Sequence, residues 1–153
     1  MRWLELKIPP PIVGLLIAAL MVLIARHSPV LALPNALRLP LALVLVAIGV
    51  LLDLNGVLAF LRARTTVNPL LPANTSAIVA TGVYRVTRNP MYLGMAAMLT
   101  GGAVYMAAPL ALLGPVAFVA YITRFQIQPE ERALLAKFGE SYRSYCQRVR
   151  RWL

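Results

Sequence analysis

The sequence predicts an all-α integral membrane protein with four transmembrane helices, the last two forming a tight hairpin, followed by a C-terminal amphipathic interfacial helix. Its composition points to this class. Of the 153 residues, 60% are hydrophobic and only 13% are charged, about half the charged fraction of a soluble domain. The apolar residues also gather in long uncharged runs, as in membrane-spanning helices. We expect residues 1–153 to form one membrane domain.

The basic residues predict how the helices are oriented. Fifteen Lys and Arg residues against five Asp and Glu residues give a formal net charge of +10. With four spans, only Arg26 and Arg38 of these basic residues lie on one side, and positive charge collects on the cytoplasmic side of membranes. We expect both termini and the 65–88 loop in the cytoplasm, in a bacterial inner membrane. A lipid environment explains the charge, so no nucleic-acid partner is expected.

Residues 1–64 are predicted to hold the first two spans. The first covers residues 11–26, after a proline run that is tolerated only at a helix start. The second covers residues 39–61 and contains Asp53, the only acidic residue inside an apolar run. An ionisable group at that depth usually faces a cavity or another helix. Asp53 either contacts substrate or a helix, or lies near the interface, hydrogen-bonded to Asn55.

Residues 65–88 form the longest segment that does not span the membrane. Pro69, Pro72 and Asn74 break any helix early, and residues 76–79 are either extended or re-entrant. A segment of this length without its own core is more often functional than a simple connection. We therefore expect residues 65–153 to form the functional part of the chain.

Residues 89–123 carry no charge. A single helix of this length would measure about 50 Å, whereas the hydrocarbon core of a bilayer is roughly 30 Å thick. The segment is therefore predicted to form a hairpin that turns near residues 107–109 or 113–115. Six small residues would let the two helices approach closely: Gly94, Ala96, Ala97, Gly101, Gly102 and Ala103.

The tail, residues 129–153, is predicted to form an amphipathic helix. Its apolar residues recur every three or four positions, from Leu135 through Tyr142 to Trp152, and its other face is basic. Such a helix either lies on an anionic lipid surface or also covers the functional site.

The start of the third span is a candidate anion site. Asn89 is a favourable helix cap, and Pro90 suits the first turn, where its missing N–H costs nothing. Free backbone N–H groups at a helix start attract anions, and Arg85 and Arg88 lie beside them. Generic signatures are absent from the sequence: there is no glycine-rich nucleotide motif, paired cysteine, histidine cluster or serine elbow.

Several motifs, in the right order, resemble those of the isoprenylcysteine carboxyl methyltransferase and phospholipid methyltransferase superfamily. They are Gly82-Val83-Tyr84, the run Arg88-Asn89-Pro90-Met91-Tyr92-Leu93-Gly94, Glu130-Glu131, Phe138-Gly139, Tyr142, Tyr145 and Val149. The resemblance covers residues 65–152. It implies S-adenosylmethionine-dependent methyl transfer to a lipophilic acceptor that enters from the bilayer. Asn89 stands where the eukaryotic carboxyl methyltransferases have histidine, and asparagine cannot transfer a proton.

The same resemblance implies which residues form the site. The cofactor contacts would fall on Ser76, Ala77, Ile78, Val79, Tyr84, Asn89, Pro90, Met91, Tyr92 and Glu130. Arg88, Arg124 and Glu131 are the catalytic candidates, and no metal is implied. The chemistry of the residues agrees: a cationic side chain and a helix start suit the carboxylate of S-adenosylmethionine, a glutamate suits its ammonium, and tyrosines suit its adenine or sulfonium.

The acceptor is left open by the sequence: it is a lipid-like thiol, a carboxylate such as that of isoprenylcysteine, an amine or a phospholipid head group. A carboxylate acceptor needs only an orienting cation, Arg88 or Arg124, whereas an amine must first be neutral and would use a glutamate as base. Two other functions also remain. Tyr145-Cys146 resembles the end of membrane sterol reductases, which would imply NADPH, and the fold could serve as a non-catalytic lipid-binding or docking module.

Overall fold

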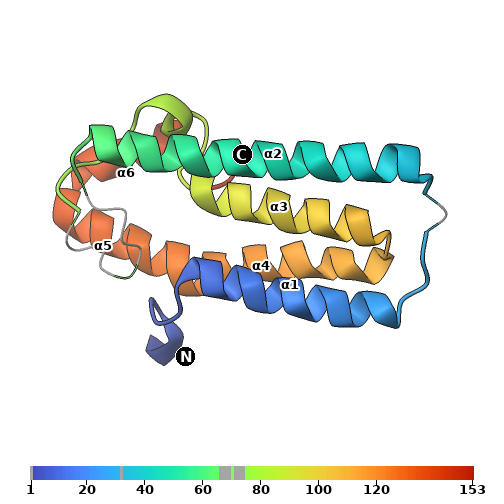
Figure 1. Cartoon of the computed structure of the whole chain (residues 1–153). Helices are drawn as coiled ribbons and strands as arrows, with labels where there is room; N and C mark the ends of the chain where they lie inside the picture. Colours follow the sequence, from blue (N-terminus) through green and yellow to red (C-terminus); the bar gives the residue numbers. More distant parts are fainter. Residues whose placement is uncertain (1, 32, 66–69, 71–74) are drawn as a thin grey trace.

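The computed structural model describes residues 2–31, 33–65, 70 and 75–153 (Figure 1). Within these residues the chain is helical and has no strand; one isolated parallel bridge joins Thr87 to Arg150. The predicted all-α class is confirmed.

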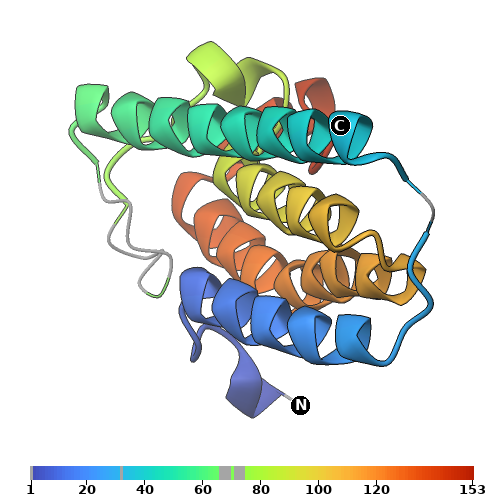
Figure 2. The ribbon, with the colours of Figure 1, turned by 45° about the vertical axis from the view of Figure 1, so that its right-hand side comes forward.

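Four helices lie side by side: α1 (Pro10–Arg26), α2 (Asn35–Arg62), α3 (Pro90–Met106) and α4 (Leu113–Ile122). Figure 2 shows them in the spatial order α2, α3, α4, α1. Helix α4 continues through η5 (Thr123–Ile127), a π-helical turn, into α5 (Gln128–Phe138), and α6 (Glu140–Arg148) follows. Three short 3-10 turns complete the described elements: η1 (Arg2–Leu4), η3 (Gly82–Arg85) and η4 (Pro109–Leu112).

Among the described residues, two stretches are long and apolar enough to cross a membrane: Asn35–Arg62, with 28 residues, and Pro109–Phe138, with 30 residues. Pro10–Arg26 is a shorter apolar helix. The outward faces of these helices carry large apolar side chains: Leu15 is 70% exposed, Leu43 59% and Val116 64%. Exposed apolar surface on this scale is unusual for a soluble monomer and is what a lipid environment requires.

The core lies between α1, α3 and α4. Phe118 and Ile122 of α4 are fully buried, and Met21 of α1 and Leu99 of α3 belong to the same apolar cluster. Ile127, in the π-helical turn, extends this cluster to the end of the bundle where α5 begins.

Small residues bring α2 and α3 together, rather than α3 and α4 as the sequence suggested. A Cβ added to Gly49 of α2 would lie 2.6 Å from the Gly94 carbonyl oxygen, and one added to Gly101 would lie 2.9 Å from the Ala42 carbonyl oxygen. Gly94 and Gly101 therefore face α2, while Ala96 and Ala103 are buried in the cluster between α1, α3 and α4. Small residues predict close packing but do not identify the partner helix.

The bundle has two different ends (Figure 1). At one end the chain reverses after α3, where Ala107 takes a left-handed conformation with φ of 50°, and the Ala107 carbonyl accepts a 2.7 Å hydrogen bond from the N–H of Leu31. The opposite end carries η3, α5 and α6, so the polar motifs of the sequence meet there.

The tail is not the single interfacial helix that the sequence predicted. It breaks at Gly139, where φ is +54°, a conformation that favours glycine. Helix α6 then folds back, and Tyr142, Tyr145 and Val149 are buried against Ile78 and neighbouring apolar residues. From Tyr142 onward the apolar stripe of the tail thus packs on protein, whereas Leu135 is 40% exposed. The same periodicity suits a protein surface and a lipid surface, so it did not decide between them.

Candidate functional site

The site is built around the start of α3. The predicted start is confirmed: Asn89 is the N-cap residue and Pro90 follows as the first helical residue. Asn89 does not cap the helix with its side chain. Its amide instead donates a 2.9 Å hydrogen bond to the Arg151 carbonyl, and its backbone N–H donates to the Thr87 hydroxyl. The side chain therefore ties the C-terminal segment to the helix start.

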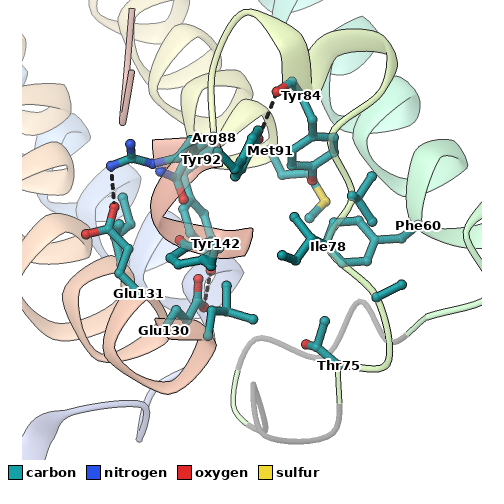
Figure 3. Close-up of a pocket in the computed structure, with 16 residues that line it drawn as sticks. Phe60, Thr75, Ile78, Tyr84, Arg88, Met91, Tyr92, Glu130, Glu131 and Tyr142 are labelled. Carbon is teal, nitrogen blue, oxygen red and sulfur yellow. Dashed lines mark hydrogen bonds and ion pairs between the residues drawn. The ribbon is translucent and has the colours of Figure 1, made fainter. Parts of the chain in front are cut away.

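Arg88 lies at the centre of the polar contacts. Its Nη1 donates to the carbonyl oxygens of Cys146, at 3.0 Å, and Val149, at 2.7 Å. Its Nη2 donates to Glu131 Oε1 at 2.7 Å, as Figure 3 shows. Its Nε is buried and has no hydrogen-bond partner within the described residues. A buried donor without an acceptor costs folding free energy, so the Nε–H group is suited to donate a hydrogen bond to an anionic ligand atom.

Glu131 joins two arginines. Besides the Arg88 contact, its two oxygens accept hydrogen bonds from Arg151, at 3.0 Å from Nε and 2.6 Å from Nη2. The Arg88 and Glu131 side chains are only 12% and 18% exposed, so this pair is partly shielded from water. The network joins α5, the α3 start and the C-terminal segment.

Glu130 has a different environment from its neighbour. Its Oε1 accepts hydrogen bonds from the Tyr92 hydroxyl, at 2.7 Å (Figure 3), and from the Gln126 amide. No ion pair between described residues involves it. The π-helical turn that precedes α5 places Gln126 within reach, and such turns often occur at functional sites. A carboxylate held by neutral donors is suited to a cationic ligand group.

Aromatic side chains form the opposite wall. Phe60 of α2 meets Tyr84 edge-on, with ring centroids 5.4 Å apart. The Tyr145 hydroxyl donates a 2.8 Å hydrogen bond to the Tyr84 carbonyl, which fixes η3 to α6. Burial raises the pKa of Tyr145 to about 12, so its hydroxyl remains a donor at physiological pH.

These groups surround a cavity of about 110 Å³. It is lined by Phe60, Thr75, Ala77, Ile78, Val79, Tyr84, Arg88, Asn89, Met91, Tyr92, Ile127, Glu130, Glu131, Leu134, Tyr142 and Tyr145 (Figure 3). A second cavity of about 420 Å³ shares Arg88, Glu131 and Tyr142 and contains Arg132, Arg143 and Arg151. The Arg88–Glu131 pair thus forms part of the wall of both cavities.

Most of the residues singled out from the sequence line this cavity. They are Ala77, Ile78, Val79, Tyr84, Arg88, Asn89, Met91, Tyr92, Glu130 and Glu131. Three others do not. Arg124 points to the N-terminal segment, where it pairs with Glu5 at 2.8 Å. Ser76 binds the Thr65 hydroxyl and the Arg64 carbonyl outside the cavity, and Pro90 is buried without lining it.

Four lining residues were not singled out from the sequence: Phe60, Thr75, Ile127 and Leu134. Phe60 belongs to the end of α2, which carries none of the motifs, and the aliphatic pair belongs to η5 and α5. Residues of these types are common in any helix, so no local signal marks them. The one usable clue for Phe60 was its place beside the charged end of a span, next to Arg62.

The arrangement can hold a ligand that carries both charges. Glu130 offers an oxygen with no cation, and Arg88 offers a buried donor with no acceptor. Both line one cavity, whose other lining side chains are aromatic or aliphatic apart from Thr75, Asn89 and Glu131. A molecule with an ammonium, a carboxylate and an apolar or aromatic part therefore matches the site.

The chain is similar to known proteins over much of its length. The model of the phospholipid methyltransferase family matches residues 37–141. A probable protein-S-isoprenylcysteine O-methyltransferase of Oryza sativa subsp. indica is 33% identical over 110 residues, which are 70% of this chain and 56% of the relative. Methanethiol S-methyltransferase 1 of Bradyrhizobium diazoefficiens is 37% identical over 70 residues, 44% of this chain and 22% of the relative.

A protein of Haemophilus influenzae with no assigned activity is 44% identical over 63 residues, which are 41% of this chain and the whole of that protein. No solved structure matches the chain. The aligned region spans only about half the length of the rice relative, so the activity of that protein does not transfer to this chain as a finding.

Proposed function

The chain belongs to the phospholipid methyltransferase family, and on this premise we propose that it transfers a methyl group from S-adenosylmethionine to a lipophilic acceptor. The family and the named activities of the relatives support methyl transfer as the reaction class. The observation that carries the proposal is the cavity that has Glu130, without a cation, and Arg88, with an unused donor, on its walls.

The residues present fit S-adenosylmethionine. Glu130 would bind its ammonium, and Arg88 Nε would donate to its carboxylate. Phe60, Tyr84 and Tyr142 line the same cavity and would contact the adenine or offer a ring face to the sulfonium. The cavity of about 110 Å³ is smaller than the roughly 300–1,000 Å³ usual for a ligand site. Binding therefore requires its walls to move apart.

When bound, S-adenosylmethionine would supply an activated methyl group for transfer to the acceptor. The protein's part is mainly to orient the two molecules. The Arg88–Glu131–Arg151 network would keep α5 and the α3 start at a fixed separation. Of the two candidate cations, Arg88 lines the cavity, whereas Arg124 pairs with Glu5 away from it.

The same proposal includes a membrane arrangement. Helices α1, α2, α3 and α4 would each cross the bilayer, with α3 and α4 as the hairpin, and the site would lie at the cytoplasmic end. The charges support this, because Arg26 and Arg38 mark one end of the bundle and the other described basic residues lie near the site end. Both termini would be cytoplasmic, and exposed Arg148 and Arg150 would face anionic lipid.

Calorimetric titration of the purified protein tests the cofactor. We expect S-adenosylmethionine to bind and NADPH to give no heat; binding of NADPH alone would favour a reductase-like relative. If neither binds to a folded sample, the methyltransferase proposal fails and a docking role gains support. Incubating membranes with S-adenosylmethionine carrying a radiolabelled methyl group, then identifying the labelled lipid, would name the acceptor.

A further inference from the structure

The second cavity, of about 420 Å³, adjoins the proposed cofactor cavity at the end of the bundle that carries α5 and α6. The Arg88–Glu131 pair belongs to the walls of both cavities. Three more arginines line the second cavity, which we call the arginine cavity: Arg132 of α5, Arg143 of α6 and Arg151 of the C-terminal segment. These arginines come from three separate elements, so the fold brings the cations together and no single charged helix face accounts for them.

The carboxylates of the chain do not balance these cations. Ion pairs between described residues join five arginines to three carboxylates: Arg88 and Arg151 to Glu131, Arg124 and Arg132 to Glu5, and Arg143 to Glu140. The chain has five acidic residues in all, and the other two, Asp53 and Glu130, do not line the arginine cavity. Neutralising the excess positive charge therefore requires an anion from outside the chain.

Each of the three arginines also keeps hydrogen-bond donors that no described residue uses. The ion pairs occupy Nη2 of Arg132, Nη1 of Arg143, and Nε and Nη2 of Arg151, and the other guanidinium nitrogens have no partner within the described residues. The Arg132 and Arg143 side chains are 56% and 60% exposed, so a ligand can reach them. The planar guanidinium group matches the oxygens of a phosphate group, which accepts several such hydrogen bonds at once.

The shape of this surface favours a bound ligand over loosely held counter-ions. A cleft lined by charges of one sign focuses the electric field and concentrates ions of the opposite sign. The volume of about 420 Å³ falls within the roughly 300–1,000 Å³ usual for a ligand site. Leu135 is exposed and lines the same cavity, so apolar surface lies beside the arginines. A phosphate group that carries an uncharged substituent therefore matches the cavity.

We propose that the arginine cavity binds a phosphate group through Arg132, Arg143 and Arg151. Two kinds of molecule carry this group: an anionic lipid, through its head group, and a soluble phosphate ester. The site is separate from methyl transfer and does not depend on the proposed function. Its occupant would nevertheless lie against the Arg88–Glu131 pair, and so next to the cavity where the methyl donor is proposed to bind.

Alkylation of Cys146 tests the proposal, because this residue is the only cysteine of the chain and lines the arginine cavity. The rate of its reaction with N-ethylmaleimide, a neutral reagent, is measured on the protein in phosphatidylcholine nanodiscs. One arm replaces part of the lipid with phosphatidylglycerol, and the other adds glycerol phosphate at constant ionic strength. We expect alkylation to slow in at least one arm, and the arm that slows identifies the source of the phosphate.

Two further measurements make the result specific to the cavity. The double variant Arg132→Gln with Arg143→Gln should need about tenfold or more of the protecting phosphate compound for the same protection, because it loses hydrogen bonds to a charged group. Native mass spectrometry of the same samples detects the bound phosphate compound directly, so the test does not depend on the reactivity of the thiol.

The matched control is Arg148→Gln, which removes an exposed arginine of α6 that does not line the cavity and should leave the protection unchanged. Gln147→Cys combined with Cys146→Ser places the thiol on the exposed surface outside the cavity, and its alkylation should be equal in all samples. Absence of both protection and bound phosphate compound in the two arms would overturn the proposal. Protection that persists unchanged in the double arginine variant would overturn it as well.

Discussion

At the scale of single residues, the adjacent glutamates of α5 have opposite tasks. Within the part of the chain that the structure describes, Glu130 receives hydrogen bonds only from neutral groups, whereas Glu131 is held between Arg88 and Arg151. One carboxylate is thus available to a ligand cation, and the other is already used to hold the protein together. Two substitutions that remove one charge each should separate these tasks.

Glu130→Gln should weaken S-adenosylmethionine binding with little effect on stability. A hydrogen bond to a charged group contributes about 1.5–3 kcal/mol, so we expect the affinity to fall by about 10- to 100-fold. Isothermal titration calorimetry measures it. Glu140→Gln, which removes a charge from the exposed Arg143 pair on α6, is the control and should bind normally. Equal affinities for Glu130→Gln and the unmodified protein would contradict the assignment.

Glu131→Gln should instead lower stability. The substitution leaves Arg88 and Arg151 close together without their carboxylate. Breaking a fully buried pair costs about 3–5 kcal/mol, and because Arg88 and Glu131 are partly exposed we expect about 1–3 kcal/mol. Thermal unfolding in detergent, with Arg143→Gln as the exposed control, would show it. A melting temperature equal to that of the unmodified protein would contradict this role.

The sequence located much of the candidate site but could not rank its cations. Arg88 and Arg124 are both basic residues at the ends of apolar runs. Arg124 is taken up by Glu5, which is 119 residues away in the chain, and only the folded structure shows that pairing. The Asn89 side chain was expected to face the ligand or cap the helix. It donates to the Arg151 carbonyl instead, and this contact too joins residues far apart in the chain.

At the scale of elements, the contact between α2 and α3 depends on absent side chains. A methyl group on Gly49 would lie 2.6 Å from the Gly94 carbonyl, a backbone atom that cannot rotate away. We expect Gly49→Ala to destabilise the protein by about 1–3 kcal/mol, as overpacking does.

Gly102→Ala is its control on α3, because a Cβ there meets nothing within 4 Å. It should be neutral or raise stability by up to about 1 kcal/mol through helix propensity. Thermal unfolding of the two variants side by side checks both. Equal melting temperatures for Gly49→Ala and Gly102→Ala would mean that α2 and α3 do not approach each other closely at Gly49.

Hydrophobic periodicity predicted helices well and their partners poorly. The start of α3 at Pro90 was predicted because capping signals are local. The fate of the tail was not, since an apolar stripe every three or four residues fits a lipid surface and a protein surface equally. The break at Gly139 needed the backbone conformation, which composition does not reveal.

At the scale of the whole molecule, the proposed orientation can be tested with reporter fusions. Alkaline phosphatase is active only outside the cytoplasm, so a fusion at the C-terminus should be inactive and one inserted after Ser28, between Arg26 and Arg38, should be active. The physical reason is the retention of basic residues at the site end in the cytoplasm. A fusion with green fluorescent protein at the C-terminus is the reciprocal control and should fluoresce. Strong phosphatase activity at the C-terminus would reverse the orientation.

The way residues 146–152 hold the start of α3 affects how the protein is made. Their carbonyls and Arg151 complete the contacts of Thr87, Arg88, Asn89 and Glu131. A ribosome delivers these residues only after α1 to α5, which can enter the bilayer as they emerge. During synthesis, a nascent chain would thus be inserted before it can hold its cofactor, so an incompletely translated copy would occupy the membrane without being able to catalyse a reaction there.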